Sequence, residues 1–169
     1  ILWRNRGDGT FEDVTERSGT GDPRWSTGAV FLDHDGDGDL DLYLANYARW
    51  PDDLEPWGLR KFKGPRFYED DDDAFLRNEG DGTFTDVSEQ AGIRVANPVT
   101  GVPMGKALGV RFADFDRDGD QDVFVANDTV QNHLFLNRGE GTFEERGFDT
   151  GVGFDGSGKA TGAMGVDLA

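Results

Sequence analysis

The chain has 169 residues, a formal net charge of -17 and 36% hydrophobic residues. Its length suits one domain, and an aromatic content of 12% favours a packed core over a disordered chain. The acidic surface excludes nucleic acid and anionic membranes as main partners, because their phosphates would be repelled. The absence of cysteine excludes disulfides and thiolate metal sites, and no apolar run is long enough for a membrane span.

The first recurring segment, "LWRNRGDGTFEDV" from Leu2, predicts a β-hairpin. Similar segments begin at Phe75 and Leu134. In each copy, glycines can supply the positive φ angles that a tight turn needs, and short apolar runs flank the turn. We expect hairpins rather than extra ion sites, with the aromatic residue after each turn packed between sheets. These residues are Phe11, Phe84 and Phe143.

The second recurring segment is an acidic loop between two predicted strands. It reads "GAVFLDHDGDGDLDLYLAN" from Gly28 and "GVRFADFDRDGDQDVFVAN" from Gly109, and a third copy begins with "GVDLA" at Gly165. The apolar flanks alternate or are rich in β-branched and aromatic residues, as strands are.

Together the segments predict four strands in about 40 residues, the size of one β-propeller blade. The fold class is therefore all-β, with antiparallel four-stranded blades in an incomplete ring. We expect a segment of a longer protein, or a chain whose open ends other chains complete, because a blade's apolar faces need neighbours. The predicted divisions are the end of one blade at 1–19, a blade at 26–92 with an insertion at 48–74, a blade at 107–148, and the first strand of another at 160–169.

The acidic loops predict two calcium sites. Each loop has Asp at positions 1, 3, 5, 7 and 9 and Gly at position 6, which provides hard oxygen ligands around a sharp turn. The residues at position 7, Asp39 and Asp120, are expected to contribute mainly their backbone carbonyls. The predicted ligands are Asp33, Asp35, Asp37, Asp39 and Asp41 in one loop, and Asp114, Asp116, Asp118, Asp120 and Asp122 in the other.

Several other interpretations of these loops are less favoured. A helix-loop-helix calcium hand needs Glu at position 12, where this chain has Leu44 and Val125. A dockerin-type loop would lead into a helix, and magnesium prefers fewer protein oxygens. A solvated acidic turn would not require two copies with the same spacing. Carboxylates bound to calcium have lowered pKa values and make poor general acids, which disfavours a catalytic acid pair.

The loops resemble the FG-GAP/VCBS repeats of integrin-α-like β-propellers. The segments from Phe75 and from Asn132 are similar to those of the bacterial and animal relatives of cartilage acidic protein, which often end in an ASPIC/UnbV module. The resemblance covers nearly all of the chain except the insertion. It implies structural Ca²⁺ sites that join the first two strands of each blade, and a seven-bladed ring for the parent protein.

The insertion is the candidate surface for a protein or glycan partner. Exposed aromatic residues mixed with cations are typical of recognition surfaces, although these residues could instead cover a blade edge. The candidate residues are Trp50, Trp57, Arg60, Lys61, Phe62, Lys63, Arg66, Phe67 and Tyr68.

Four other features carry weaker predictions. His34 and His133 lack the partners of a catalytic triad or a zinc site, and we expect the His34 side chain to point away from the ion. Asn127 begins an N-glycosylation pattern but follows a strand. The acidic run from Glu69 to Asp73 lacks the glycine that a metal loop needs.

We expect a non-enzymatic, secreted or cell-surface module, with a periplasmic location also possible. Its role would be adhesion, binding or assembly, and its partners a protein, a glycan or further copies of itself. Two alternatives remain: a subunit of a self-assembling fibre or layer, and a scaffold segment of a propeller enzyme with its active site elsewhere.

Overall fold

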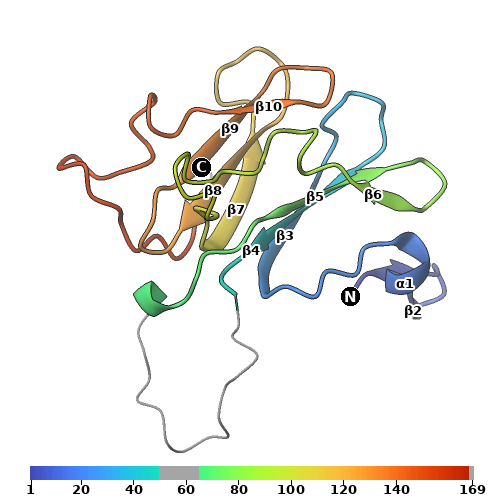
Figure 1. Cartoon of the computed structure of the whole chain (residues 1–169). Helices are drawn as coiled ribbons and strands as arrows, with labels where there is room; N and C mark the ends of the chain where they lie inside the picture. The colour runs from blue at the N-terminus through green and yellow to red at the C-terminus, as the bar shows by residue number, and fades with distance from the viewer. Residues whose placement is uncertain (50–64, 168–169) are drawn as a thin grey trace, which may run out of the picture.

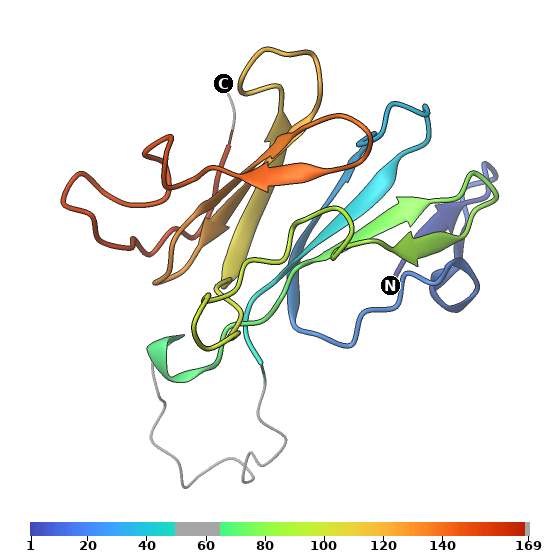
Figure 2. The same ribbon diagram turned by 45° about the horizontal axis from the view of Figure 1, so that its top comes forward.

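The computed structural model describes residues 1–49 and 65–167 and confirms the all-β prediction. Its strands form one two-stranded and two four-stranded antiparallel sheets, none of them closed, with strands adjacent in sequence also adjacent in space. Figures 1 and 2 show the two four-stranded sheets side by side. The elements are β1 (Trp3–Asn5), β2 (Phe11–Asp13), α1 (Thr15–Ser18), β3 (Ser26–Leu32), β4 (Asp41–Asn46), η1 (Pro65–Phe67), β5 (Ala74–Asn78), β6 (Phe84–Asp86), β7 (Ala107–Ala113), β8 (Asp122–Asn127), β9 (His133–Asn137) and β10 (Phe143–Glu145).

Asparagine side chains shape the three predicted hairpins. The Oδ1 atoms of Asn5, Asn78 and Asn137 each accept a hydrogen bond from the glycine N–H two residues later, at 2.8, 3.0 and 3.0 Å. This local bond stabilises the chain reversal and leaves the flanking strands free to pair. The segments are therefore hairpins, as their sequence predicts.

The main core lies between the two four-stranded sheets. One sheet contributes Tyr43 and Phe75, and the other contributes Val125, Phe135 and Phe143. Side chains alternate between the two faces of each strand, so neighbouring residues such as Leu42 and Leu76 pack in a separate cluster on the other face of the first sheet. The first sheet is thus apolar on both faces, as expected for a blade between neighbours.

The three equivalent aromatic residues after the hairpin turns lie in different surroundings. Phe143 is 7% exposed, and its ring centroid lies 5.6 Å from that of Phe75 in the opposite sheet. Phe84 is partly buried on the other face of the first sheet. Phe11 is 59% exposed, so the prediction that it packs between sheets is wrong in this structure. In the described part of the chain, no sheet covers the face of β1 and β2 that carries Phe11.

The prediction of a strand at 160–169 is also corrected. Residues 160–167 form no strand, only an isolated bridge between Asp128 and Gly162. Their position nevertheless follows the repeat. A Cβ at Gly109 would lie 3.4 Å from Val166 Cγ1, just as one at Gly28 would lie 3.4 Å from Val110 Cγ1. A blade's first strand pairs with its second, and no described strand pairs with this segment.

The equivalent positions Phe143 and Phe11 provide a test of the core. We expect Phe143→Ala to reduce the free energy of unfolding by about 3–5 kcal/mol, because it leaves a cavity between the sheets. Phe11→Ala should change it by less than about 1 kcal/mol, since that ring already contacts water. Urea unfolding of both variants measures the difference, and equal losses would contradict the assigned core.

Candidate metal centres

The two acidic loops connect the first and second strands of their sheets. One spans 33–40 between β3 and β4, and the other spans 114–121 between β7 and β8. The fourth residue of each loop has a left-handed backbone, with φ of 74° at Gly36 and 68° at Arg117. The loops therefore share one backbone path, although only one has glycine at this position.

Carboxylates converge in both loops. Ligand atoms of Asp33, Asp35 and Asp37 lie within 4.8 Å of one another in the first loop. In the second loop the corresponding cluster is Asp114, Asp116 and Asp122. These are hard oxygen donors near the surface, beside a tight turn, and this donor set fits Ca²⁺.

Not every predicted ligand joins these two clusters. Asp37 joins its cluster and Asp118 does not, although each accepts a hydrogen bond from the N–H two residues later, at 2.8 and 2.9 Å. Asp39 Oδ2 would lie only 2.9 Å from a Cβ at Gly80, so this side chain points toward the next hairpin. Asp120 Oδ2 has the same relation to Gly139, at 3.7 Å. For Asp39 and Asp120, therefore, the backbone carbonyl and not the side chain remains the candidate ligand.

The last carboxylate of each loop is buried and holds the loop to its sheet. Asp41 accepts hydrogen bonds from the backbone N–H of His34 at 3.0 Å and of Asn78 at 2.8 Å. Asp122 repeats the arrangement with Phe115 at 2.7 Å and Asn137 at 2.8 Å. Each carboxylate therefore connects the start of its loop to the hairpin between the third and fourth strands of the same sheet.

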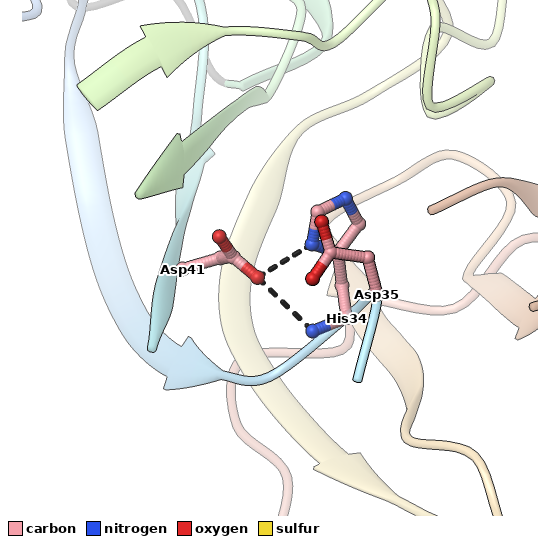
Figure 3. Close-up of side chains that lie close together, drawn as sticks. All are labelled: His34, Asp35 and Asp41. Atoms are coloured by element: carbon pink, nitrogen blue, oxygen red, sulfur yellow. Dashed lines mark hydrogen bonds and ion pairs between the residues drawn. The ribbon is translucent and has the colours of Figure 1, made fainter. Parts of the chain in front are cut away.

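His34 makes the first loop different from the second. Its Nδ1 lies 2.5 Å from Asp41 Oδ2, the oxygen that already accepts the His34 N–H, as Figure 3 shows. Both lone pairs of that oxygen are thereby used, and Asp41 groups with His34 and Asp35 rather than with Asp33 and Asp37. Phe115 has no side-chain donor, so Asp122 keeps a free lone pair and joins its cluster.

The pKa values of the two buried carboxylates shift in opposite directions, in agreement with this difference in hydrogen bonding. Burial raises the pKa of Asp41, but the hydrogen bonds from His34 and Asn78 outweigh it and leave the pKa below its usual value. Burial raises the pKa of Asp122, and the N–H groups of Asn137 and Phe115 only partly oppose it. The imidazole of His34 supplies the extra stabilisation in the first loop.

The His34–Asp41 pair is a feature that sequence reasoning missed. The His34 ring packs against Phe75 at a centroid distance of 4.6 Å and faces Phe143 of the other sheet at 6.4 Å. A histidine seven residues before the last Asp of the loop, and two residues after the apolar Leu32, is the signal that could have indicated it.

The described part of the insertion contains only three candidate partner-binding residues. Phe67 is 71% exposed in η1, with Arg66 also exposed and Tyr68 half-buried. The other candidates lie outside the described residues: Trp50, Trp57, Arg60, Lys61, Phe62 and Lys63.

The acidic run from Glu69 to Asp73, at the end of the insertion, anchors this segment to its surroundings. The Glu69 carbonyl accepts a hydrogen bond from Arg49 N–H at 2.9 Å, and Lys106 Nζ pairs with Asp70 at 2.9 Å. Arg24 donates to the Asp72 carbonyl at 2.8 Å. These contacts give the run a structural role.

The remaining polar candidates are structural as well. Asn127 is fully buried and donates from Nδ2 to the Gln131 carbonyl at 2.8 Å, which is incompatible with glycosylation of the folded chain. His133 is buried, and burial lowers its pKa to about 4, so the ring is neutral.

A comparison with known protein families matches the chain to the FG-GAP-like repeat at residues 1–44, 67–125 and 114–169. The first two spans each contain a hairpin followed by an acidic loop, and they end at the equivalent residues Leu44 and Val125. The unmatched residues, 45–66, fall mostly within the insertion. A comparison with curated proteins finds no match.

The shared left-handed position gives a test of loop geometry. Arg117→Gly should raise the free energy of unfolding by up to about 1 kcal/mol, because glycine adopts this backbone without strain. Gly36→Arg should lower it by a similar amount, since a Cβ there meets no atom within 4 Å and only the backbone is strained. Thermal unfolding in EDTA measures both changes, and shifts of the same sign would contradict the common loop path.

Proposed function

Since the chain belongs to the FG-GAP-like repeat family, we propose that it is a calcium-stabilised extracellular repeat module for binding, adhesion or assembly, without catalytic activity of its own. Repeats of this family are commonly extracellular modules of this kind and are typically non-enzymatic. Among the described helices, none is long and apolar enough to cross a membrane. The finer resemblance to cartilage acidic protein and its relatives stays a prediction.

The observation that carries the proposal is a cluster of three carboxylates in the equivalent loop of each of two sheets. Three carboxylates whose ligand atoms lie within 4.8 Å of one another repel each other. Hydrogen bonds from neutral backbone N–H groups in each loop offset only part of this repulsion. Gly36 and Gly38 donate to Asp33 at 2.9 and 3.1 Å, and Gly119 donates to Asp114 at 3.2 Å. A bound Ca²⁺ would supply the positive charge that offsets the remaining repulsion.

The position of the clusters gives calcium a structural role. Each loop is bonded through its buried Asp to a hairpin of the same sheet. Ordering the loop therefore stabilises the strands on both sides of it. Calcium sites of extracellular modules have dissociation constants of roughly 10⁻⁴–10⁻³ M, so they fill outside the cytosol and not within it.

Calcium titration tests this function. We expect two ions to bind, and a concentration ten times the dissociation constant should stabilise the chain by about 1.4 kcal/mol per site. Asp35→Asn and Asp116→Asn should each remove about one bound ion in isothermal titration calorimetry and reduce the calcium-dependent rise in melting temperature.

The matched control is Asp81→Asn, in a hairpin turn where this carboxylate accepts hydrogen bonds from Thr83 at 2.9 and 2.6 Å. This variant should bind calcium like the wild type. If the control and the loop variants lost calcium equally, or the wild type bound none at millimolar concentration, the proposal would be wrong.

Assembly is a second candidate function, favoured by exposed apolar residues on the N-terminal hairpin. Trp3 is 57% exposed and Phe11 is 59% exposed, and they occupy equivalent positions to the buried residues Phe135 and Phe143. Sedimentation velocity at rising protein concentration should show association that Trp3→Ser weakens. A monomer at all concentrations would count against assembly through this face.

A further inference from the structure

Asp73 is a buried carboxylate at the start of β5, beside the core between the two sheets. It is 8% exposed, and each of its oxygens accepts one hydrogen bond. The donors are the backbone N–H of Asn46 and the hydroxyl of Tyr43, both at 2.7 Å. Burying an ionised carboxylate with so few donors is unfavourable unless a cation compensates.

The second sheet meets the same structural need without a charge. There Asn132 occupies the equivalent position, and its Oδ1 accepts the backbone N–H of Asn127 at 2.9 Å. Phe124 replaces the tyrosine, so the acid and the phenol occur together in one sheet and are both absent from the other. A neutral side chain therefore suffices for the hydrogen bond to the backbone. The acid at Asp73 makes the same bond and, unlike Asn132, can also bind or release a proton.

Among the described residues, no cation forms an ion pair with Asp73. Arg24, whose charge reaches Asp73, forms its ion pair with Asp22 at 2.6 Å. The other nearby cations also pair with other carboxylates. The titratable and charged groups around this site are Tyr43, Arg24, Asp22, Asp70, Asp71, Asp72, Arg94, Lys106 and His133.

His133 faces the same site as a neutral base. It lines a cavity of about 10 Å³ together with Asp73, and its Nε2 is buried without a hydrogen-bond partner. The imidazole is held by a hydrogen bond to the backbone of Met104. Because burial keeps the pKa of His133 near 4, the ring adds no positive charge near neutral pH. An ionised Asp73 is therefore poorly compensated.

We propose that Asp73 is a proton-binding switch that stabilises the folded chain as the pH falls from neutral to mildly acidic. When Asp73 is protonated, its Oδ2–H donates to the Tyr43 oxygen, and Oδ1 still accepts the Asn46 N–H. The Tyr43 oxygen then accepts a hydrogen bond where its hydroxyl had donated one, so the two side chains stay within hydrogen-bond distance in both states. Phe124 could not make this exchange in the second sheet.

The direction of the pH dependence follows from the two states of the chain. Burial raises the pKa of Asp73 to about 7 in the folded chain, although Asn46 and Tyr43 oppose the shift. The usual value of an unfolded Asp is about 3.9, so the folded state binds this proton more tightly. The stabilisation is fully present below about pH 4 and is lost as the pH rises through about 7.

Asp73→Asn isolates this contribution from the other carboxylates. Urea unfolding is measured from pH 4.5 to 8 at a fixed calcium concentration. The ratio of the unfolding constant of the wild type to that of the variant should rise with pH, by up to about tenfold per unit between pH 4.5 and 7. A ratio that does not change with pH would overturn the proposal.

A control variant and a direct measurement complete the test. Asp72→Asn changes the adjacent carboxylate, which pairs with Arg94 at 3.2 Å near the surface, and should show no such slope. A carboxyl ¹³C titration of the wild type does not depend on the variants folding. A midpoint near pH 7 for Asp73 supports the proposal, and a midpoint below pH 4 overturns it.

Discussion

A buried carboxylate ends each acidic loop, and its hydrogen bonds join the loop to the rest of the sheet. Asp41 and Asp122 each accept one N–H from the start of their own loop and one from a hairpin asparagine. The connection continues between the sheets, because Asn137 Nδ2 donates to the His34 carbonyl at 2.8 Å. The loops are thus part of the framework that positions both the sheets and the candidate metal centres.

The same backbone framework supports two sheets whose polar groups differ. His34 satisfies Asp41 in the first loop, whereas Phe115 leaves Asp122 available to its cluster. The two proposed calcium sites are therefore not equivalent. The buried Asp122 belongs to the cluster of the second loop, whereas the buried Asp41 does not belong to the cluster of Asp33, Asp35 and Asp37 in the first. Sequence repeats in this chain preserve the strand order and the loop path while the charge distribution varies from sheet to sheet.

Repeat comparison predicted the strands, the hairpins and the division into four-stranded sheets, because these depend on local patterns that recur. It also indicated the two loops in which carboxylates converge, but not which of the alternate positions join each cluster. The exposure of Phe11 and the burial of Asn127 and Asp73 could not be predicted in this way. Burial depends on which neighbouring sheet covers a face, and equivalent positions in the repeat have different neighbours.

The central claim is that calcium is the cation held by these two loops. Equilibrium dialysis of the full chain at millimolar free calcium measures this directly through the number of ions bound per chain. Two bound ions would agree with the clusters at Asp33 and Asp114. No bound calcium would show that the loops are acidic turns held by backbone hydrogen bonds alone, and would contradict the account.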